Sequence, residues 1–252
     1  MRRRTALAIS VFAVLVFTGV ALADQTCVTS GCVYVPVITN PPTLTPIPPT
    51  ATPQPTPTKT PAPAVYIVGN TFSFVDSIDY LHVIGEVRNT RSSVVQFVKI
   101  TANFFSGSGQ LAANDFTYTW LDELAPNTTT CFEVSLKQPA GWASYQFEPV
   151  SYSTTTKRVP NLTIFNDSGS LRSFGNYQFI GQVQNNEAVQ VKFVQVVGTL
   201  YNSAQTPIDC SFTYVNSTDL NPGQNSSFTL TTSGRDYSDV ASYRLQASGN
   251  LP

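Results

Sequence analysis

The amino-acid sequence predicts an all-β protein, with two tandem antiparallel β-sandwich modules behind an export signal and a linker rich in proline and threonine. Three observations predict this arrangement. The N-terminus has the pattern of a signal peptide, a run of prolines follows it, and the rest of the chain repeats itself with apolar residues at every second position. We expect residues 1–23 to be the signal peptide, 24–64 a cysteine-containing segment and disordered linker, 65–158 the first module and 159–252 the second.

The signal begins with three arginines at positions 2–4 and continues with an uncharged run over residues 6–20. Ala21-Leu22-Ala23 then supplies the small-x-small pattern that signal peptidase cleaves. Cleavage after Ala23 predicts a secreted or cell-surface protein. The alternative is a retained anchor, because the uncharged run is nearly long enough to span a bilayer. Contact with a membrane is therefore expected only through an uncleaved signal.

The linker holds eleven prolines among the 29 residues from Pro36 to Ala64. Proline fixes φ and lacks the backbone donor, so this stretch forms neither helix nor sheet. At ~3.1 Å per residue, an extended polyproline-II spacer of this length reaches roughly 90 Å. We expect a stalk that holds the modules away from the cell.

A tandem repeat follows the linker. Residues 84–89 (IGEVRN) match residues 180–185 (IGQVQN) at an offset of 96, and the same offset gives 13 identities in the 49 positions from Ile84 to Phe132 without a gap. Two residues are then inserted, so that Ser144 corresponds to Ser242. The repeat indicates a duplication with its boundary near residues 157–160.

Apolar residues recur with a period of two inside each copy, which predicts strands with one buried face. The face expected in the core carries Leu81, Val83, Gly85, Val87, Val98, Ile100, Ala102, Phe104, Phe132 and Val134, and their counterparts in the second copy. Turn residues separate these runs, as in 106–109 (SGSG) and 220–223 (LNPG). Six or seven short strands in about 94 residues are typical of a sandwich of two sheets.

GxVxN, a long strand that ends in an aromatic pair and a turn, and LxPG before a strand with phenylalanine form a recognisable pattern. In this pattern both copies resemble the FxLYD domain family. The signature positions read 102–106 (ANFFS) in the first copy and 198–202 (GTLYN) in the second, so the first Phe and the Asp of the name are replaced. The resemblance implies Ig-like or fibronectin-III-like sandwiches of exported bacterial proteins, and it supplies no site residues.

Charge and composition argue against several functions. Charged residues make up 12% of the chain, and removal of the signal leaves 11 basic against 15 acidic residues. A protein without a basic cluster is not expected to bind nucleic acid. His82, the one histidine, falls on the polar face of its strand, and no acidic pair has the spacing of a calcium loop. We therefore expect no cofactor, no metal and no catalytic residue.

The aromatic residues include the candidates for ligand stacking. Phe116 and Tyr118 recur in the second copy, which indicates scaffold positions. Trp120 and Trp142 have no aromatic counterpart. If the protein binds a glycan, these two rings are the expected stacking residues; packing in the core or between the modules is the other interpretation.

Four cysteines, Cys27, Cys32, Cys131 and Cys210, are candidates for disulfides in an exported chain. Cys27 and Cys32 are close enough in sequence to close a short loop. Cys131 and Cys210 lack a partner within their own copy, so they either bridge the modules or remain reduced and buried. The sequence leaves all three pairings open.

These observations favour a non-catalytic extracellular or cell-envelope module for adhesion, spacing or protein assembly, with an envelope protein or a glycan as its partner. The alternative is a carbohydrate-binding protein that uses Trp120 and Trp142. An enzyme is the least favoured of the three.

Overall fold

The computed structural model describes residues 64–252. The predicted signal peptide, Cys27, Cys32 and nearly all of the linker lie outside them. Apart from one short 3-10 turn, η1 (Ser173–Gly175), the regular elements are antiparallel strands, which confirms the all-β prediction. The strands are β1 (Val65–Val75), β2 (Tyr80–Asn89), β3 (Val94–Ser106), β4 (Leu111–Tyr118), β5 (Glu123–Leu124), β6 (Thr129–Lys137), β7 (Trp142–Phe147), β8 (Ser151–Thr155), β9 (Leu162–Leu171), β10 (Tyr177–Asn185), β11 (Lys192–Tyr201), β12 (Pro207–Tyr214), β13 (Asn225–Thr232) and β14 (Ser242–Asn250).

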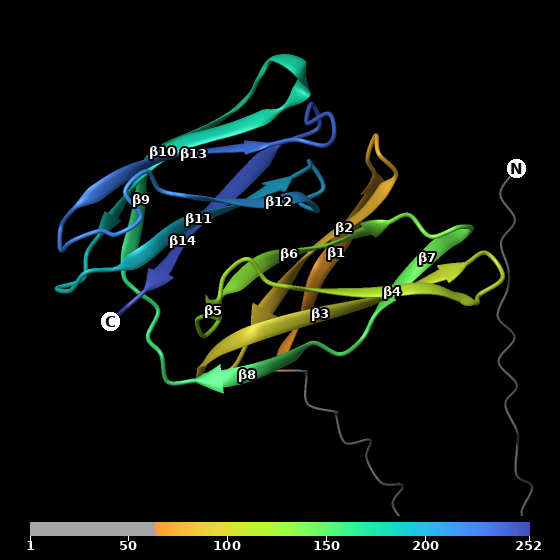
Figure 1. Cartoon of the computed structure of the whole chain (residues 1–252), viewed down its shortest axis with the longest axis horizontal. Coiled ribbons are helices and arrows are strands. Elements are labelled where there is room, and N and C mark those ends of the chain that lie inside the picture. Colours follow the sequence, from red (N-terminus) through yellow and green to blue (C-terminus); the bar gives the residue numbers. More distant parts are fainter. Residues whose placement is uncertain (1–63) are drawn as a thin grey trace, which may run out of the picture. The chain divides into compact units, whose positions relative to one another are not determined.

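Each copy of the repeat forms two sheets (Figure 1). The first copy has the sheet β1-β2-β6 and a second sheet in which β3 pairs with β4, β5, β7 and β8. The second copy has the corresponding sheets β9-β10-β13 and β12-β11-β14. Pro149 lies in the gap between β7 and β8, whereas the equivalent β14 runs without a break. Proline has no backbone donor for the ladder, which explains the interruption.

The core of each copy lies between its two sheets and is lined by the predicted face of the strands. Ten of the side chains that define this face, five in each copy, are at most 2% exposed: Leu81, Val83, Val98, Ile100, Phe104, Phe179, Val183, Val194, Val196 and Leu230. A period of two places these residues on one side of each strand, and burial of that side drives the sheets together.

The GxVxN motif has a physical reason at each of its three positions. A methyl group on Gly85 would lie 2.5 Å from the ring of Phe132, so only glycine leaves room for that core phenylalanine. Val87 is fully buried. Asn89 is also fully buried, and its amide donates to the carbonyl oxygens of Ser93 (3.0 Å), Leu124 (2.9 Å) and Ala125 (3.2 Å).

The second copy repeats this arrangement. Gly181 leaves room for the ring of Phe228. Asn185 donates to the carbonyl oxygens of Val189 (2.9 Å) and Leu220 (2.8 Å). The motif is therefore a packing and loop-anchoring device, which explains why it recurs.

The backbone preserves the repeat as well. Phe97 and Phe193 both have φ of 52°, and Asn127 and Gly223 have φ of 59° and 73°. Both pairs are separated by the offset of 96. A left-handed conformation is uncommon for a phenylalanine, so its recurrence indicates a bulge required by the fold.

All described residues belong to one compact unit, and the predicted boundary after residue 158 remains a prediction. No helix in residues 64–252 is long and apolar enough to cross a membrane.

Candidate functional site

A disulfide joins the two copies of the repeat. Cys131 on β6 and Cys210 on β12 are bonded, with their Cα atoms 6.0 Å apart. Alternation along β6 turns Cys131 away from the first core, yet both cysteines are at most 2% exposed. The outward side of β1-β2-β6 is therefore covered by the outward side of β12-β11-β14, and we call this contact the seam.

Polar side chains bind across the seam around the disulfide. The hydroxyl of Tyr201 donates to Glu86 at 2.6 Å, and the guanidinium of Arg244 binds the same carboxylate oxygen. Two glutamines of the second copy, Gln195 and Gln246, donate to backbone carbonyl oxygens of the first copy at 3.0 Å. Charge-assisted bonds to a half-buried carboxylate are among the stronger polar contacts in proteins, so they orient one copy on the other.

The two tryptophans of the predicted stacking site lie apart in packing positions. Trp120 is half-buried at the seam, where its ring centre lies 4.8 Å from that of Phe212. Trp142 is half-buried and packs against the core of the first copy. The Nε1 atoms of both rings are buried and have no hydrogen-bond partner among the described residues. Both rings therefore lie in packing positions, which is the second of the two interpretations that the sequence allows.

Phe116 and Tyr118, interpreted above as scaffold positions, are half exposed, at 51% and 49%. Their rings meet edge to face with centres 6.0 Å apart, and the Lys99 ammonium lies 3.8 Å from the centre of the Phe116 ring. Residues 99 and 101 of β3 pair with 118 and 116 of β4, so these side chains share the outward side of the sheet. The counterpart of Phe116 in the second copy, Phe212, is the ring that Trp120 covers at the seam.

A hollow of about 560 Å³ adjoins this aromatic pair. Its lining includes Phe97, Tyr118, Asp122, Glu123 and Lys157. The Lys157 ammonium lies 3.0 Å from the Glu123 carboxylate. Partial burial, and then the charge of Glu123, raise the pKa of Asp122 above its usual value. Aromatic rings beside acceptors and one cation provide both apolar and hydrogen-bonding contact for a ligand.

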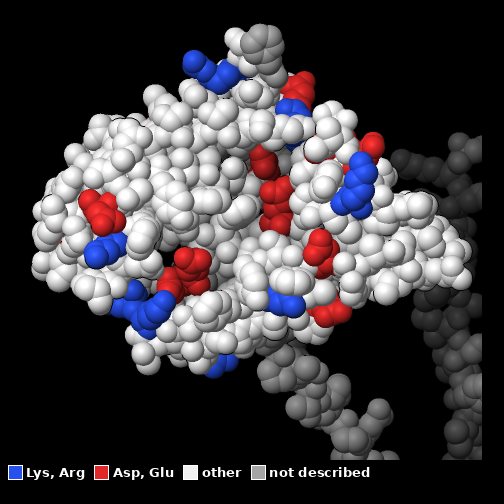
Figure 2. Space-filling view, in the orientation of Figure 1, with Lys and Arg blue, Asp and Glu red and all other residues white. Residues whose placement is uncertain are grey.

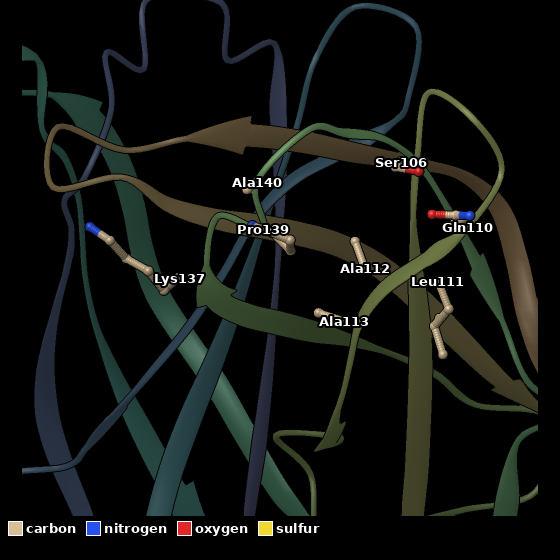
Figure 3. Close-up of a pocket in the computed structure, with 8 residues that line it drawn as sticks. All are labelled: Ser106, Gln110, Leu111, Ala112, Ala113, Lys137, Pro139 and Ala140. Carbon is tan, nitrogen blue, oxygen red and sulfur yellow. The ribbon is translucent and has the colours of Figure 1, made fainter.

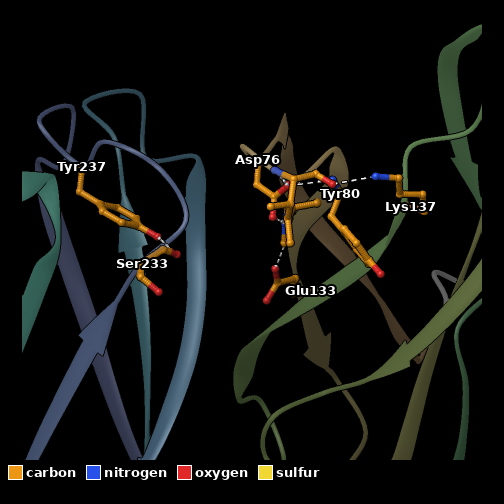
Figure 4. Close-up of polar contacts among 8 residues, drawn as sticks. Asp76, Tyr80, Glu133, Lys137, Ser233 and Tyr237 are labelled. Atoms are coloured by element: carbon orange, nitrogen blue, oxygen red, sulfur yellow. Dashed lines mark hydrogen bonds and ion pairs between the residues drawn. The ribbon is translucent and has the colours of Figure 1, made fainter.

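His82 is not the solvated residue that its position on the strand predicted. Its Nδ1 lies 2.6 Å from Glu133, its Nε2 lies 3.4 Å from Asp76, and its ring stacks on Phe74. The side chains of Asp76 and Glu133 are labelled in Figure 4. The hydrogen bond to Glu133 is the main cause that raises the pKa of His82. His82 on β2 pairs with Ser135 on β6, and Glu133 lies two residues away on the same side of β6, within reach of the imidazole. The pattern of one strand does not reveal a contact between two strands.

A second hollow, of about 400 Å³, lies between the turn after β3 and the loop after β6 (Figure 3). Small aliphatic side chains make up much of its lining, and Lys137 is the charged residue among them. The Lys137 ammonium donates to the carbonyl oxygen of Ile78 at 2.8 Å. Few polar groups converge here, so this hollow is a weaker candidate than the one beside Tyr118.

Charges are sparse on the face shown in Figure 2, where uncharged residues cover most of the surface. Among residues 64–252, no group of three or more His, Cys, Asp and Glu side chains is placed to hold a metal ion.

Comparisons with known proteins add little. No family model matches the chain, and a search of curated proteins found no match. Solved structures with partial likeness include a transglutaminase of red sea bream (10% identity, TM-score 0.23) and an exo-chitosanase of Amycolatopsis orientalis (11% identity, TM-score 0.25). The matches cover 75% and 71% of this chain but span only 30% and 25% of those two chains. Likeness at these scores carries no argument about function.

Proposed function

We propose that the protein is a non-catalytic, exported module of the cell envelope that binds a macromolecular partner through the outward side of β3 and β4. The observation that carries the proposal is the half-exposed pair Phe116 and Tyr118. Aromatic residues are enriched where proteins meet their partners. The equivalent side in the second copy is already used for a protein contact, the seam, which supports the same use in the first copy.

The seam supports a spacing role. A disulfide, a carboxylate bound by two side chains and a stacked aromatic pair hold the copies together. Two copies held in this way present the outward side of β3 and β4 in one fixed orientation. Copies joined only by a flexible linker would rotate relative to each other. Export, the stalk and the resemblance to FxLYD domains remain predictions from the sequence, and they agree with this role.

The test is co-sedimentation of the exported full-length chain with isolated cell envelopes. The variant Phe116→Ser with Tyr118→Ser removes the aromatic pair and is expected to abolish sedimentation. A matched control, Phe193→Ser with Tyr214→Ser, removes two comparably exposed rings of the second copy (59% and 50%) and is expected to sediment normally. Undiminished sedimentation of the first variant would contradict the proposal.

Carbohydrate binding is the second candidate, and the hollow beside Tyr118 favours it. Phe97 and Tyr118 line it with aromatic surface, and the carboxylates of Asp122 and Glu123 in the same lining can accept hydrogen bonds from sugar hydroxyls. Wall polysaccharide freed of protein distinguishes the candidates. If the wild-type chain sediments with this polysaccharide and the variant Phe97→Ser does not, the result supports a glycan partner. If the chain sediments only with protein-containing envelopes, the result supports a protein partner.

A further inference from the structure

The seam joins two different faces of the same kind of module. The first copy contributes the outward side of β1-β2-β6 through Glu86 and Cys131. We call this side, and the equivalent side of β9-β10-β13, face 1. The second copy contributes the outward side of β12-β11-β14 through Tyr201, Cys210 and Phe212. We call this side, and the equivalent side of the β3 sheet in the first copy, face 2. A contact between unlike faces is heterologous, and it leaves one face of each kind unused.

The unused faces are face 2 of the first copy and face 1 of the second copy. On the first, Asn114 stands where the second copy has Cys210, and Phe116 where it has Phe212. On the second, Ser227 stands where the first copy has Cys131, and Gln182 where it has Glu86. Asn114 and Ser227 are exposed, and Phe116 is half exposed.

We propose that face 2 of the first copy binds face 1 of the second copy in another molecule of this chain, in the geometry of the seam. The inference rests on the proposed function and names the partner of its binding surface. Repetition of one heterologous contact adds molecules head to tail, which gives a ring if the rotation closes and a filament if it does not.

The chemistry of the two unused faces is compatible but weaker than that of the seam. Glu86 and Arg244 are replaced by Gln182 and Gln146, so a neutral amide pair takes the place of the ion pair and no like charges meet. Trp120 is replaced by Asn216, so the aromatic stacking on the phenylalanine is lost. The contact is therefore reversible and favoured at high local concentration, as on a crowded cell surface.

Engineered cysteines test this geometry directly. In the double variant Asn114→Cys with Ser227→Cys, the new thiols stand at the positions equivalent to Cys210 and Cys131, whose Cα atoms are 6.0 Å apart in the seam. That separation suits a disulfide. Mild oxidation of the full-length chain at about 1 mM, the effective concentration typical of tethered partners, is expected to give a ladder of disulfide-linked oligomers.

Three controls fix the interpretation. Each single variant lacks one thiol of the pair and is expected to give no ladder. The pair Ser108→Cys with Ser238→Cys places exposed thiols in turns and measures random cross-linking. Peptide mapping is expected to find residue 114 bonded to residue 227.

A ladder no stronger than that of the control pair, or bonds that join 114 only to 114, would overturn the inference. Envelope sedimentation of the Phe116→Ser, Tyr118→Ser variant separates this failure from that of the proposed function. If sedimentation depends on those rings and no 114–227 bond forms, the surface is a binding site whose partner is not a second copy.

Discussion

Loss of the bridge between the copies is expected to destabilise the chain strongly. In the variant Cys131→Ala with Cys210→Ala, the unfolded chain regains the freedom of a closed loop whose ends are 79 residues apart. Loop-closure entropy for that length corresponds to about 4.5 kcal/mol at 25 °C. The free energy of unfolding should fall by about this amount, which is a large part of a typical domain's total stability.

Guanidinium unfolding followed by tryptophan fluorescence measures this change. Trp120 reports on the seam and Trp142 on the core of the first copy, so both signals accompany the transition. The denaturant slope should rise in the variant, because the uncrosslinked chain exposes more surface when it unfolds.

The control variant Cys27→Ala with Cys32→Ala leaves the bridge intact and should not show this loss. A loss below about 0.5 kcal/mol, the range of ordinary surface substitutions, would refute the reasoning. So would the detection of free thiols at residues 131 and 210 in the unreduced wild-type chain.

Three further predictions concern the cores. Asn89→Ala and Asn185→Ala should each cost about 3 kcal/mol in denaturant unfolding, because they remove four and three side-chain hydrogen bonds, at ~1 kcal/mol apiece, and leave buried carbonyls unpaired. A cost under ~1 kcal/mol would contradict the anchoring role. Gly85→Ala and Gly181→Ala should lower the thermal midpoint, because the new methyl group meets a core phenylalanine and overpacking costs about 1–3 kcal/mol; an unchanged midpoint would show that the ring moves freely. Burial raises the pKa of Asp209 from 3.8 to about 6. The wild-type chain should therefore lose about 3 kcal/mol as pH rises from about 4 to 6, and Asp209→Asn should remove that dependence; equal pH profiles for both chains would contradict it.

Much of the fold was predictable because its signals are local. Alternation with a period of two shows which residues share a face, and the repeat shows the same pattern twice, as for Val98 and Val194. Recurrence alone did not distinguish a core position from an outward one. Phe116 recurs as Phe212, yet neither lies in the core of its own copy: one is half exposed and the other is covered by Trp120.

What the outward faces contact was decided only by the tertiary structure. The strand pattern of the first copy turns Cys131 and Glu86 outward, where water is the default neighbour. Their partners, Cys210 and Tyr201, lie 79 and 115 residues further along the chain. No local period encodes such a contact, since it depends on how two finished sheets pack. The sequence by itself therefore determined the strands, the two cores and the duplication. The tertiary structure decided the seam and the aromatic surface that remains open.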